Sequence, residues 1–368
     1  MTLFSEFGNY SLEVRIMTNK IVERRSFKLA AKAVWVAILF LAGFQLLAYD
    51  GALYPDLLGK WSYKLSTFNF GSYGLTAAEK DAFAKDMQEL AAVFHETPVL
   101  SSPKGIDADA SADLDLPCAK DSCKQSRVKG KLGISLVFFC ESKDGKPMRA
   151  QSGNASFTVF TNLQEVLASK NSLWYNGMRD EQGNEIFFEP KKVKDVDGFP
   201  LYENGMMVIA KNNKPVWVPA TVEQFLKLII RDLKAEVEKS YKNLPPEMAA
   251  QQPENPLSAM VKNMEAELAG LSPEKRKAPA YFISQQRMML GPPIVDKSEP
   301  DARPLVMVNP DYFDKSLPRT AVQLIVISWS DIPNYGFVAP SFQEAPPESR
   351  EFEVLNTLDY KKLAGLLK

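Results

Sequence analysis

The feature that most constrains this chain is an uncharged, apolar run at residues 33–48, AVWVAILFLAGFQLLA. Four basic residues stand close before it, and a charge-bearing sequence follows it. The basic residues are Arg24, Arg25, Lys28 and Lys32. A basic segment, an apolar segment and a small residue at the cleavage point make up a secretory signal. We therefore expect residues 1–48 to be a signal peptide, cut after Ala48, and the protein to be exported, either to the periplasm or to the medium.

An uncleaved membrane anchor is the alternative for the same segment. Its sixteen residues form a helix of about 24 Å, whereas a comfortable membrane span needs about 20 residues. That length favours a signal peptide. Leu46, however, is larger than a cleavage site prefers at that position, so a helix that tethers the protein to an envelope membrane stays open. Membrane contact is expected only through residues 33–48, and a start at Met17 instead of Met1 would shorten the basic segment.

The remaining composition is that of a globular protein, with 45% hydrophobic and 24% charged residues. Residues 49–368 are long enough for one or two domains. The 44 basic and 45 acidic residues nearly balance, so there is no basic excess to attract a phosphate backbone, and nucleic acid is not an expected partner. The sequence carries no cofactor motif, and we expect no cofactor.

Helices and strands are both predicted along this region. Apolar residues at helical spacing predict helices at 76–95, 220–241, 257–270 and 359–367, and short apolar runs predict strands at 131–140, 156–160, 205–210, 214–219, 304–309 and 321–329. Hairpins are expected at 178–188 and at 205–219, the second turning at Asn212 and Asn213. The predicted fold class is α+β, a mainly antiparallel sheet built from hairpins with amphipathic helices packed on it.

A Pro-rich segment at residues 243–256 reads NLPPEMAAQQPENP and is expected to be a linker. It leaves two forms of organisation open. Residues 49–368 form either one exported α+β region or two subdomains, 49–242 and 257–368.

Three cysteines follow the apolar run. Four residues separate Cys118 from Cys123, and export would favour a disulfide that closes a small loop between them. Free or metal-linked thiols are the alternative. Cys140 ends the apolar run GISLVFFC and is expected to be a small buried side chain.

An acidic stretch at residues 101–126 is expected to be an exposed loop. Its oxygen-bearing side chains alternate, which suits a hard cation such as calcium; the candidate ligands are Asp107, Asp109, Asp113 and Asp115. Ala112 and Cys118 stand where an EF-hand loop has glycine and glutamate. A solvated acidic loop without a metal is therefore the competing interpretation.

A second polar segment, NPDYFDKSLPRT at residues 309–320, lies between two expected strands. Loops held by rigid strands are where binding residues tend to lie. The candidate binding residues are Asn309, Asp311, Tyr312, Asp314, Lys315 and Arg319. A connector stabilised by Asp and Pro turn chemistry is the alternative.

No specific catalytic motif is present, so catalysis is not the first expectation. His95 is the single histidine and a formal candidate base, but a histidine at a helix end also interacts with the helix dipole. The first hypothesis is an exported protein that acts by binding or as a structural component, with an unknown ligand. The second is a secreted hydrolase whose carboxylates meet only in the fold. The third is an envelope protein tethered by residues 33–48.

Overall fold

The computed structural model describes most of the chain from residue 53 onward. The described residues are 53–115, 126–150, 155–169, 171, 173, 178–179, 184–203, 205–211, 214–242, 256–284, 293–329 and 350–368. The predicted signal segment 1–48, the disulfide pair Cys118 and Cys123, and the bend at Asn212 and Asn213 lie outside them. No helix of the described residues is both long enough and apolar enough to span a bilayer.

The chain divides into two compact units. One contains Met1–Leu53 with Cys140–Pro147, and the other contains Tyr54–Phe139 with Met148–Lys368. In the first unit, the backbone of Leu53 forms an isolated antiparallel β-bridge with Cys140. The Cys140 side chain is buried and is not part of a disulfide. The expectation that Cys140 is a small buried side chain is confirmed. The second unit carries the helices and most of the residues of the two sheets.

The larger sheet has nine strands in the order β1-β2-β3-β5-β14-β10-β9-β8, with β4 paired to β3. The bounds are β1 Trp61–Leu65, β2 Ile106–Leu114, β3 Gly130–Glu141, β4 Pro147–Arg149, β5 Ala155–Thr161, β8 Lys192–Val196, β9 Phe199–Tyr202, β10 Met206–Ala210 and β14 Leu324–Trp329. The pair β1–β2 is parallel, and the pairs from β2 to β8 along this order are antiparallel.

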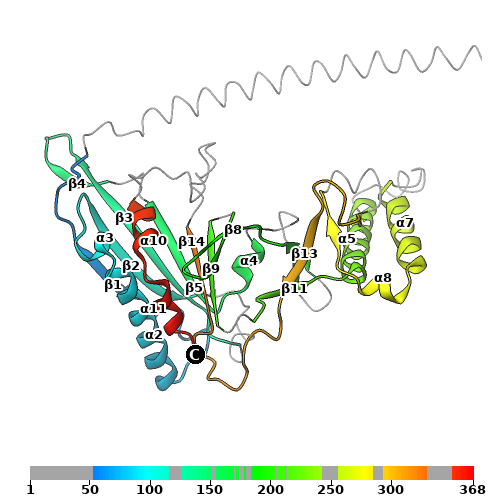
Figure 1. The fold of residues 1–368 in the computed structure, drawn as a ribbon, viewed down its shortest axis with the longest axis horizontal. Helices are drawn as coiled ribbons and strands as arrows, with labels where there is room; N and C mark the ends of the chain where they lie inside the picture. Colours follow the sequence, from blue (N-terminus) through cyan, green and yellow to red (C-terminus); the bar gives the residue numbers. More distant parts are fainter. Residues whose placement is uncertain are drawn as a thin grey trace, which may run out of the picture. The chain divides into compact units, whose positions relative to one another are not determined.

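Helices cover one face of this sheet (Figure 1). They are α2 Ala77–His95, α3 Pro98–Ser101, α10 Arg350–Thr357 and α11 Tyr360–Gly365. Every second residue of β2 and β3 points into this core, as strand geometry requires. Over β10 and β14 the opposite face is also apolar and packs against α4, Glu165–Ser169, and against residues of the second sheet.

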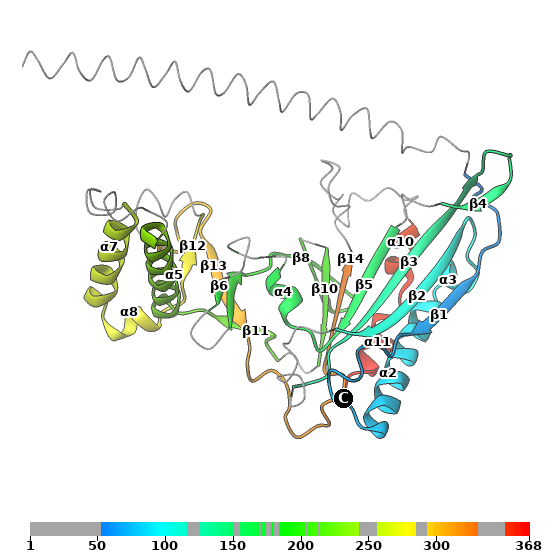
Figure 2. The ribbon, with the colours of Figure 1, turned by 180° about the vertical axis from the view of Figure 1, so that it is seen from behind.

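The smaller sheet has the order β11-β13-β7-β6, with β12 paired to β13. Its strands are β6 Met178–Arg179, β7 Glu185–Phe188, β11 Trp217–Pro219, β12 Tyr281–Phe282 and β13 Arg303–Val308. Three helices lie beside it (Figure 2), namely α5 Val222–Lys242, α7 Pro256–Gly270 and α8 Pro273–Lys277. The predicted apolar stripe of α5 packs against this sheet through Phe225, Leu226 and Ile229, which are all buried.

Local helix signals in the sequence are confirmed. Thr76 and Glu79 form a reciprocal capping box at the start of α2. At the start of α5 the Thr221 amide donates to Gln224 Oε1 at 2.9 Å, and the Gln224 amide donates to Thr221 Oγ1 at 3.2 Å. Each pair satisfies two amides that the first helical turn leaves unpaired.

Two predictions of local structure are wrong. The acidic stretch is not a loop at residues 106–114, because these residues form strand β2 in the interior of the large sheet. The expected hairpin at 205–219 does not form either. Strand β10 pairs with β9 and β14, whereas β11 pairs with β13 in the other sheet. The hairpin at 178–188 is confirmed by the pairing of β6 with β7.

The predicted fold class is confirmed as a mixture of helices and mainly antiparallel sheets, an α+β arrangement. Strand pairing crosses the boundary that the Pro-rich linker suggested. Strand β14 lies between β5 and β10, and β13 lies between β11 and β7. Each sheet therefore combines strands from before and after residues 243–256, while the division into two subdomains at this linker stays a prediction.

Candidate functional site

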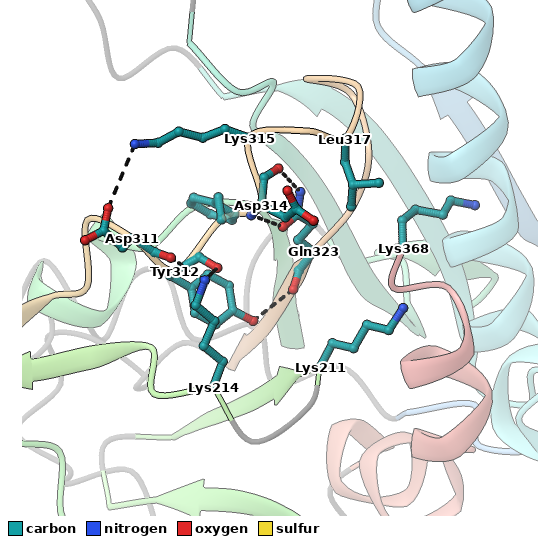
Figure 3. Close-up of a pocket in the computed structure, with 10 residues that line it drawn as sticks. Lys211, Lys214, Asp311, Tyr312, Asp314, Lys315, Leu317, Gln323 and Lys368 are labelled. Atoms are coloured by element: carbon teal, nitrogen blue, oxygen red, sulfur yellow. Dashed lines mark hydrogen bonds and ion pairs between the residues drawn. The ribbon is translucent and has the colours of Figure 1, made fainter.

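The segment 309–320 lines a cleft of about 620 Å³, which we call the lysine cleft (Figure 3). Its lining residues are Lys211, Lys214, Asp311, Tyr312, Phe313, Asp314, Lys315, Leu317, Gln323 and Lys368. Four of the six predicted binding residues are in this set, namely Asp311, Tyr312, Asp314 and Lys315. The other two, Asn309 and Arg319, lie outside the lining and hold the segment in place.

Asn309 fixes the start of the segment to the two residues that precede strand β11. Its backbone amide donates to the Val216 carbonyl at 2.9 Å, and its Nδ2 donates to the Pro215 carbonyl at 2.9 Å. Its Oδ1 accepts the Asp311 amide at 3.0 Å. This turn positions Asp311 and Tyr312 at the edge of the cleft, and Asn309 itself is buried.

Gln323 and Tyr312 hold the middle of the segment onto the start of β14. Gln323 is buried; its Oε1 accepts the Asp314 amide at 2.8 Å, and its Nε2 donates to the Asp314 carbonyl at 3.1 Å. The Tyr312 hydroxyl donates to the Gln323 carbonyl at 2.9 Å. Burial raises the pKa of Tyr312 to about 12, so this hydroxyl keeps its proton and its hydrogen bond at neutral pH.

Arginines tie the far end of the segment to the rest of the fold. Arg319 forms a two-point ion pair with Glu79, at 2.7 Å and 3.1 Å, and also donates to the Tyr73 carbonyl at 3.1 Å. The Arg319 guanidinium, together with the Thr76 amide, lowers the pKa of Glu79 to about 2. Arg127 donates to the carbonyls of Asp314 at 2.7 Å and Pro318 at 3.1 Å. These contacts make Arg319 a structural residue rather than a ligand contact.

The four lysines of the cleft differ in how far they are already paired. Lys214 is held, because its ammonium donates to the carbonyls of Asp311 and, at 2.6 Å, Tyr312. Lys315 reaches toward Asp311 at 3.9 Å, with both side chains more than 80% exposed, at 82% and 84% (Figure 3). Lys368 lies 3.6 Å from Asp86. Lys211 is exposed, and among the described residues its ammonium makes no ion pair.

The two carboxylates of the cleft do not cancel its positive charge. Asp314 Oδ1 accepts the Ser316 amide at 2.8 Å and the Ser316 hydroxyl at 2.7 Å, which keeps the pKa of Asp314 below its usual value. Asp311 stands in solvent beside Lys315. Since Asp86 pairs with Lys368, four ammonium groups stand against three carboxylates, and the cleft carries a small local excess of positive charge.

Three of the predicted calcium ligands, Asp107, Asp109 and Asp113, lie on the outward face of β2, and Asp115 follows the end of the strand. Asp107 and Asp109 both pair with Arg149, Asp107 at 3.5 Å from its Nε. Asp107 also accepts the Lys60 amide at 2.8 Å, and Asp109 accepts the Ser62 hydroxyl at 2.7 Å. Nowhere in the described ranges do three acidic, cysteine or histidine side chains gather as a metal site would require. The calcium site at Asp107, Asp109, Asp113 and Asp115 stays a prediction.

His95 lies at the end of α2, and its ring stacks on Trp61 with the centroids 5.0 Å apart. Both line a smaller, open cleft of about 420 Å³ together with Ser101 and Ser102. No hydrogen bond between His95 and either serine occurs among the described residues. The geometry thus shows a stacking contact rather than an activated nucleophile.

Sequence analysis missed Lys211, Lys214, Gln323 and Lys368. A local signal existed for the first two, because they flank the polar pair Asn212–Asn213 in the sequence. No local signal exists for Lys368, which is brought to the cleft when its amide donates to the Val322 carbonyl at 2.8 Å.

A scan against protein-family models, a search of curated proteins and a search of solved structures each found no match for this chain. No relative therefore supplies a function. The lysine cleft, at about 620 Å³, is larger than the clefts of about 420 Å³ and 320 Å³ that are lined by other described residues, and its residues are the basis for assigning a function.

Proposed function

We propose that this is an exported, non-catalytic binding protein whose ligand is a small anion held in the lysine cleft. The observation that supports this most is the grouping of Lys211, Lys214, Lys315 and Lys368 around one cleft of about 620 Å³. Cavities of roughly 300–1,000 Å³ suit small molecules. A positively charged cleft attracts an anion by its field and holds it by charge-assisted hydrogen bonds.

The exposure of the lysines also sets the affinity for an anion that we expect. Most of the lining lysines are exposed, and exposed charge pairs each contribute only about 0.2–1 kcal/mol. Lys214 offers little extra, because its ammonium already serves two carbonyls. A simple anion should therefore bind with a dissociation constant on the order of 0.1–1 mM, which corresponds to about −4 to −5.5 kcal/mol.

The cleft does not favour the secreted hydrolase that the sequence left open. Two carboxylates do share it, Asp311 and Asp314, but a glycosidase-type pair needs one carboxyl that keeps its proton near neutral pH. Hydrogen bonds from Ser316 lower the pKa of Asp314 instead. Asp311 is exposed to water beside a lysine. Asp314 is exposed as well, so neither carboxyl lies in apolar surroundings.

Anion binding is tested by thermal unfolding of the full chain with citrate, sulfate or chloride at matched ionic strength. A ligand that binds the folded state raises the unfolding temperature in a concentration-dependent way. We expect citrate to do so, and the double variant Lys211→Gln/Lys315→Gln to weaken its binding about 5- to 30-fold, for a loss of about 1–2 kcal/mol. The matched control Lys64→Gln/Lys80→Gln removes the same charge from exposed sites outside the cleft. Equal citrate affinity in both double variants would refute the assignment.

Export is tested by the intact mass of the protein recovered from cells and medium. We expect a chain that starts at Tyr49 and is two hydrogens lighter than the reduced form, the result of cleavage after Ala48 and of a bond between Cys118 and Cys123. A full-length mass found only with membranes would favour the tethered alternative instead.

A further inference from the structure

A second cavity, of about 320 Å³, lies next to the lysine cleft, and we call it the aromatic slot. Its lining residues are Gly198, Phe199, Pro200, Tyr202, Val208, Ala210, Lys214, Pro215, Val216 and Trp217. Lys214 lines both cavities. The two spaces are therefore neighbours that share one side chain as a wall.

The aromatic slot differs chemically from the lysine cleft. Tyr202 and Trp217 meet edge to face, with ring centroids 5.4 Å apart, and Val208 and Val216 are buried. The indole N–H of Trp217 donates to Glu189 at 3.3 Å, so the one polar atom of that ring already has a partner. Among the described residues of the lining, Lys214 is the one that carries a charge. Such a surface suits an apolar chain or a flat ring.

Lys214 is placed to separate a charged part of a ligand from an apolar part. Its ammonium is held at the segment 309–320 by the carbonyls of Asp311 and Tyr312, and lies 5.8 Å from the centroid of the Tyr312 ring. A lysine anchored in this way offers its charge on one side and its aliphatic stem on the other. The shared wall is therefore polar toward the lysine cleft and apolar toward the slot.

We infer that the lysine cleft and the aromatic slot form one bipartite site for an amphipathic carboxylate, either a fatty acid of medium length or an aryl-alkyl acid. The carboxylate lies at Lys211 and Lys315, and the apolar body lies against Pro200, Tyr202 and Trp217. This inference rests on the proposed function, since it assigns the ligand class of the same cleft. It adds that the ligand must carry apolar surface next to its charge.

The test uses the full chain and isothermal titration with acetate, butyrate, hexanoate and octanoate, with octanol as a neutral probe. Burying each methylene should tighten binding by about fourfold until the slot is filled. We expect octanoate to bind at least tenfold more tightly than butyrate, and octanol at least tenfold more weakly than octanoate.

Two slot variants separate this inference from the proposed function. Ala210→Phe places a ring in the slot and should weaken octanoate binding at least tenfold while leaving citrate affinity unchanged. Trp217→Leu removes one wall and should flatten the dependence on chain length, which keeps the test intact if the first variant folds poorly. The pair Lys211→Gln/Lys315→Gln should weaken both ligands.

The outcomes are distinct. Citrate binding without any dependence on chain length would overturn the bipartite site and leave the proposed function standing. Octanol that binds as tightly as octanoate would show that the lysines do not contribute to binding. No binding of citrate or of any of the carboxylates would overturn both the inference and the proposed function.

Discussion

The acidic strand β2 and the segment 309–320 are both rich in charged residues, yet the fold uses their charges in opposite ways. On β2 the carboxylates of Asp107 and Asp109 are paired with Arg149 and accept hydrogen bonds from Lys60 and Ser62. In the segment 309–320 the backbone is satisfied instead, by Gln323, Arg127 and Lys214. Asp311 and Lys315 stand exposed at the edge of the cleft, whereas Arg319 pairs with Glu79 outside it.

This difference shows what separates a structural charge from an available one. A charge on a strand face can neutralise a neighbour on the next strand, because register places the two side chains close together. A loop whose backbone is held by buried side chains can present charges that have no such neighbour. The predictions below test that contrast, starting with the largest expected effect.

The largest effect is expected from a charge placed on the wrong face of β2. Ala110 is buried in the core beneath α2, whereas its neighbour Ser111 is exposed. Ala110→Asp should lower the free energy of unfolding by more than about 4 kcal/mol, because a carboxylate would lose its water without gaining a partner. Ser111→Asp should change it by no more than about 0.5 kcal/mol. Urea unfolding measures the loss of unfolding free energy in each variant. Equal losses would mean that the side chains of β2 do not alternate between the buried and the exposed face.

The same strand shows why part of the fold could be predicted from the sequence and part could not. The capping pairs at Thr76 and Thr221 and the apolar stripe of α5 depend on residues three or four apart, so the local sequence contains them. In β2 the inward residues include Ala108, Ala110 and Ala112. Their low hydrophobicity made a buried strand look like a polar loop.

Long-range pairing explains the other failures. Strands β10 and β11 look like a hairpin locally, but each has a partner about a hundred residues later, in β14 and β13. The sequence predicted only part of the lysine cleft, for a related reason. Asp311, Tyr312, Asp314 and Lys315 are adjacent in sequence, whereas Lys211, Lys214 and Lys368 reach the cleft only through tertiary contacts.

The second effect concerns Gln323, which holds the cleft segment by two hydrogen bonds to Asp314. Gln323→Ala leaves the amide and the carbonyl of Asp314 without these partners, and we expect the free energy of unfolding to fall by about 2–3 kcal/mol. Citrate binding should weaken in parallel, because the segment loses its position. Gln88→Ala on the exposed face of α2 is the control and should leave both quantities unchanged. A stable variant with normal citrate affinity would show that Gln323 does not organise the cleft.

The third effect is the pH dependence of the ion pair between Glu79 and Arg319. The folded protein has a Glu79 pKa of about 2, below the ordinary value of 4.5. The folded state thus binds this proton less readily than the unfolded state does, and the pair stabilises the fold above pH 4.5 and loses its effect as the pH falls toward 2. Glu79→Gln should lower the free energy of unfolding by about 1–2 kcal/mol at pH 7. The difference from the wild type should shrink between pH 4.5 and 2, and a difference that is constant with pH would assign the effect to the helix cap alone.

The smallest effect is expected at Arg149, whose side chain pairs with the carboxylates of β2. Its side chain is half exposed, so Arg149→Ala should cost at most about 1 kcal/mol of unfolding free energy, as exposed pairs do. The loss leaves Asp107 and Asp109 without their cation. If the β2 carboxylates serve only this pair, adding calcium at millimolar concentration should raise the unfolding temperature of neither the wild type nor the variant beyond what matched magnesium does. A specific rise with calcium in the variant would show that Arg149 occupies a latent cation site, and the charges of β2 would then be as available to a ligand as those of the lysine cleft.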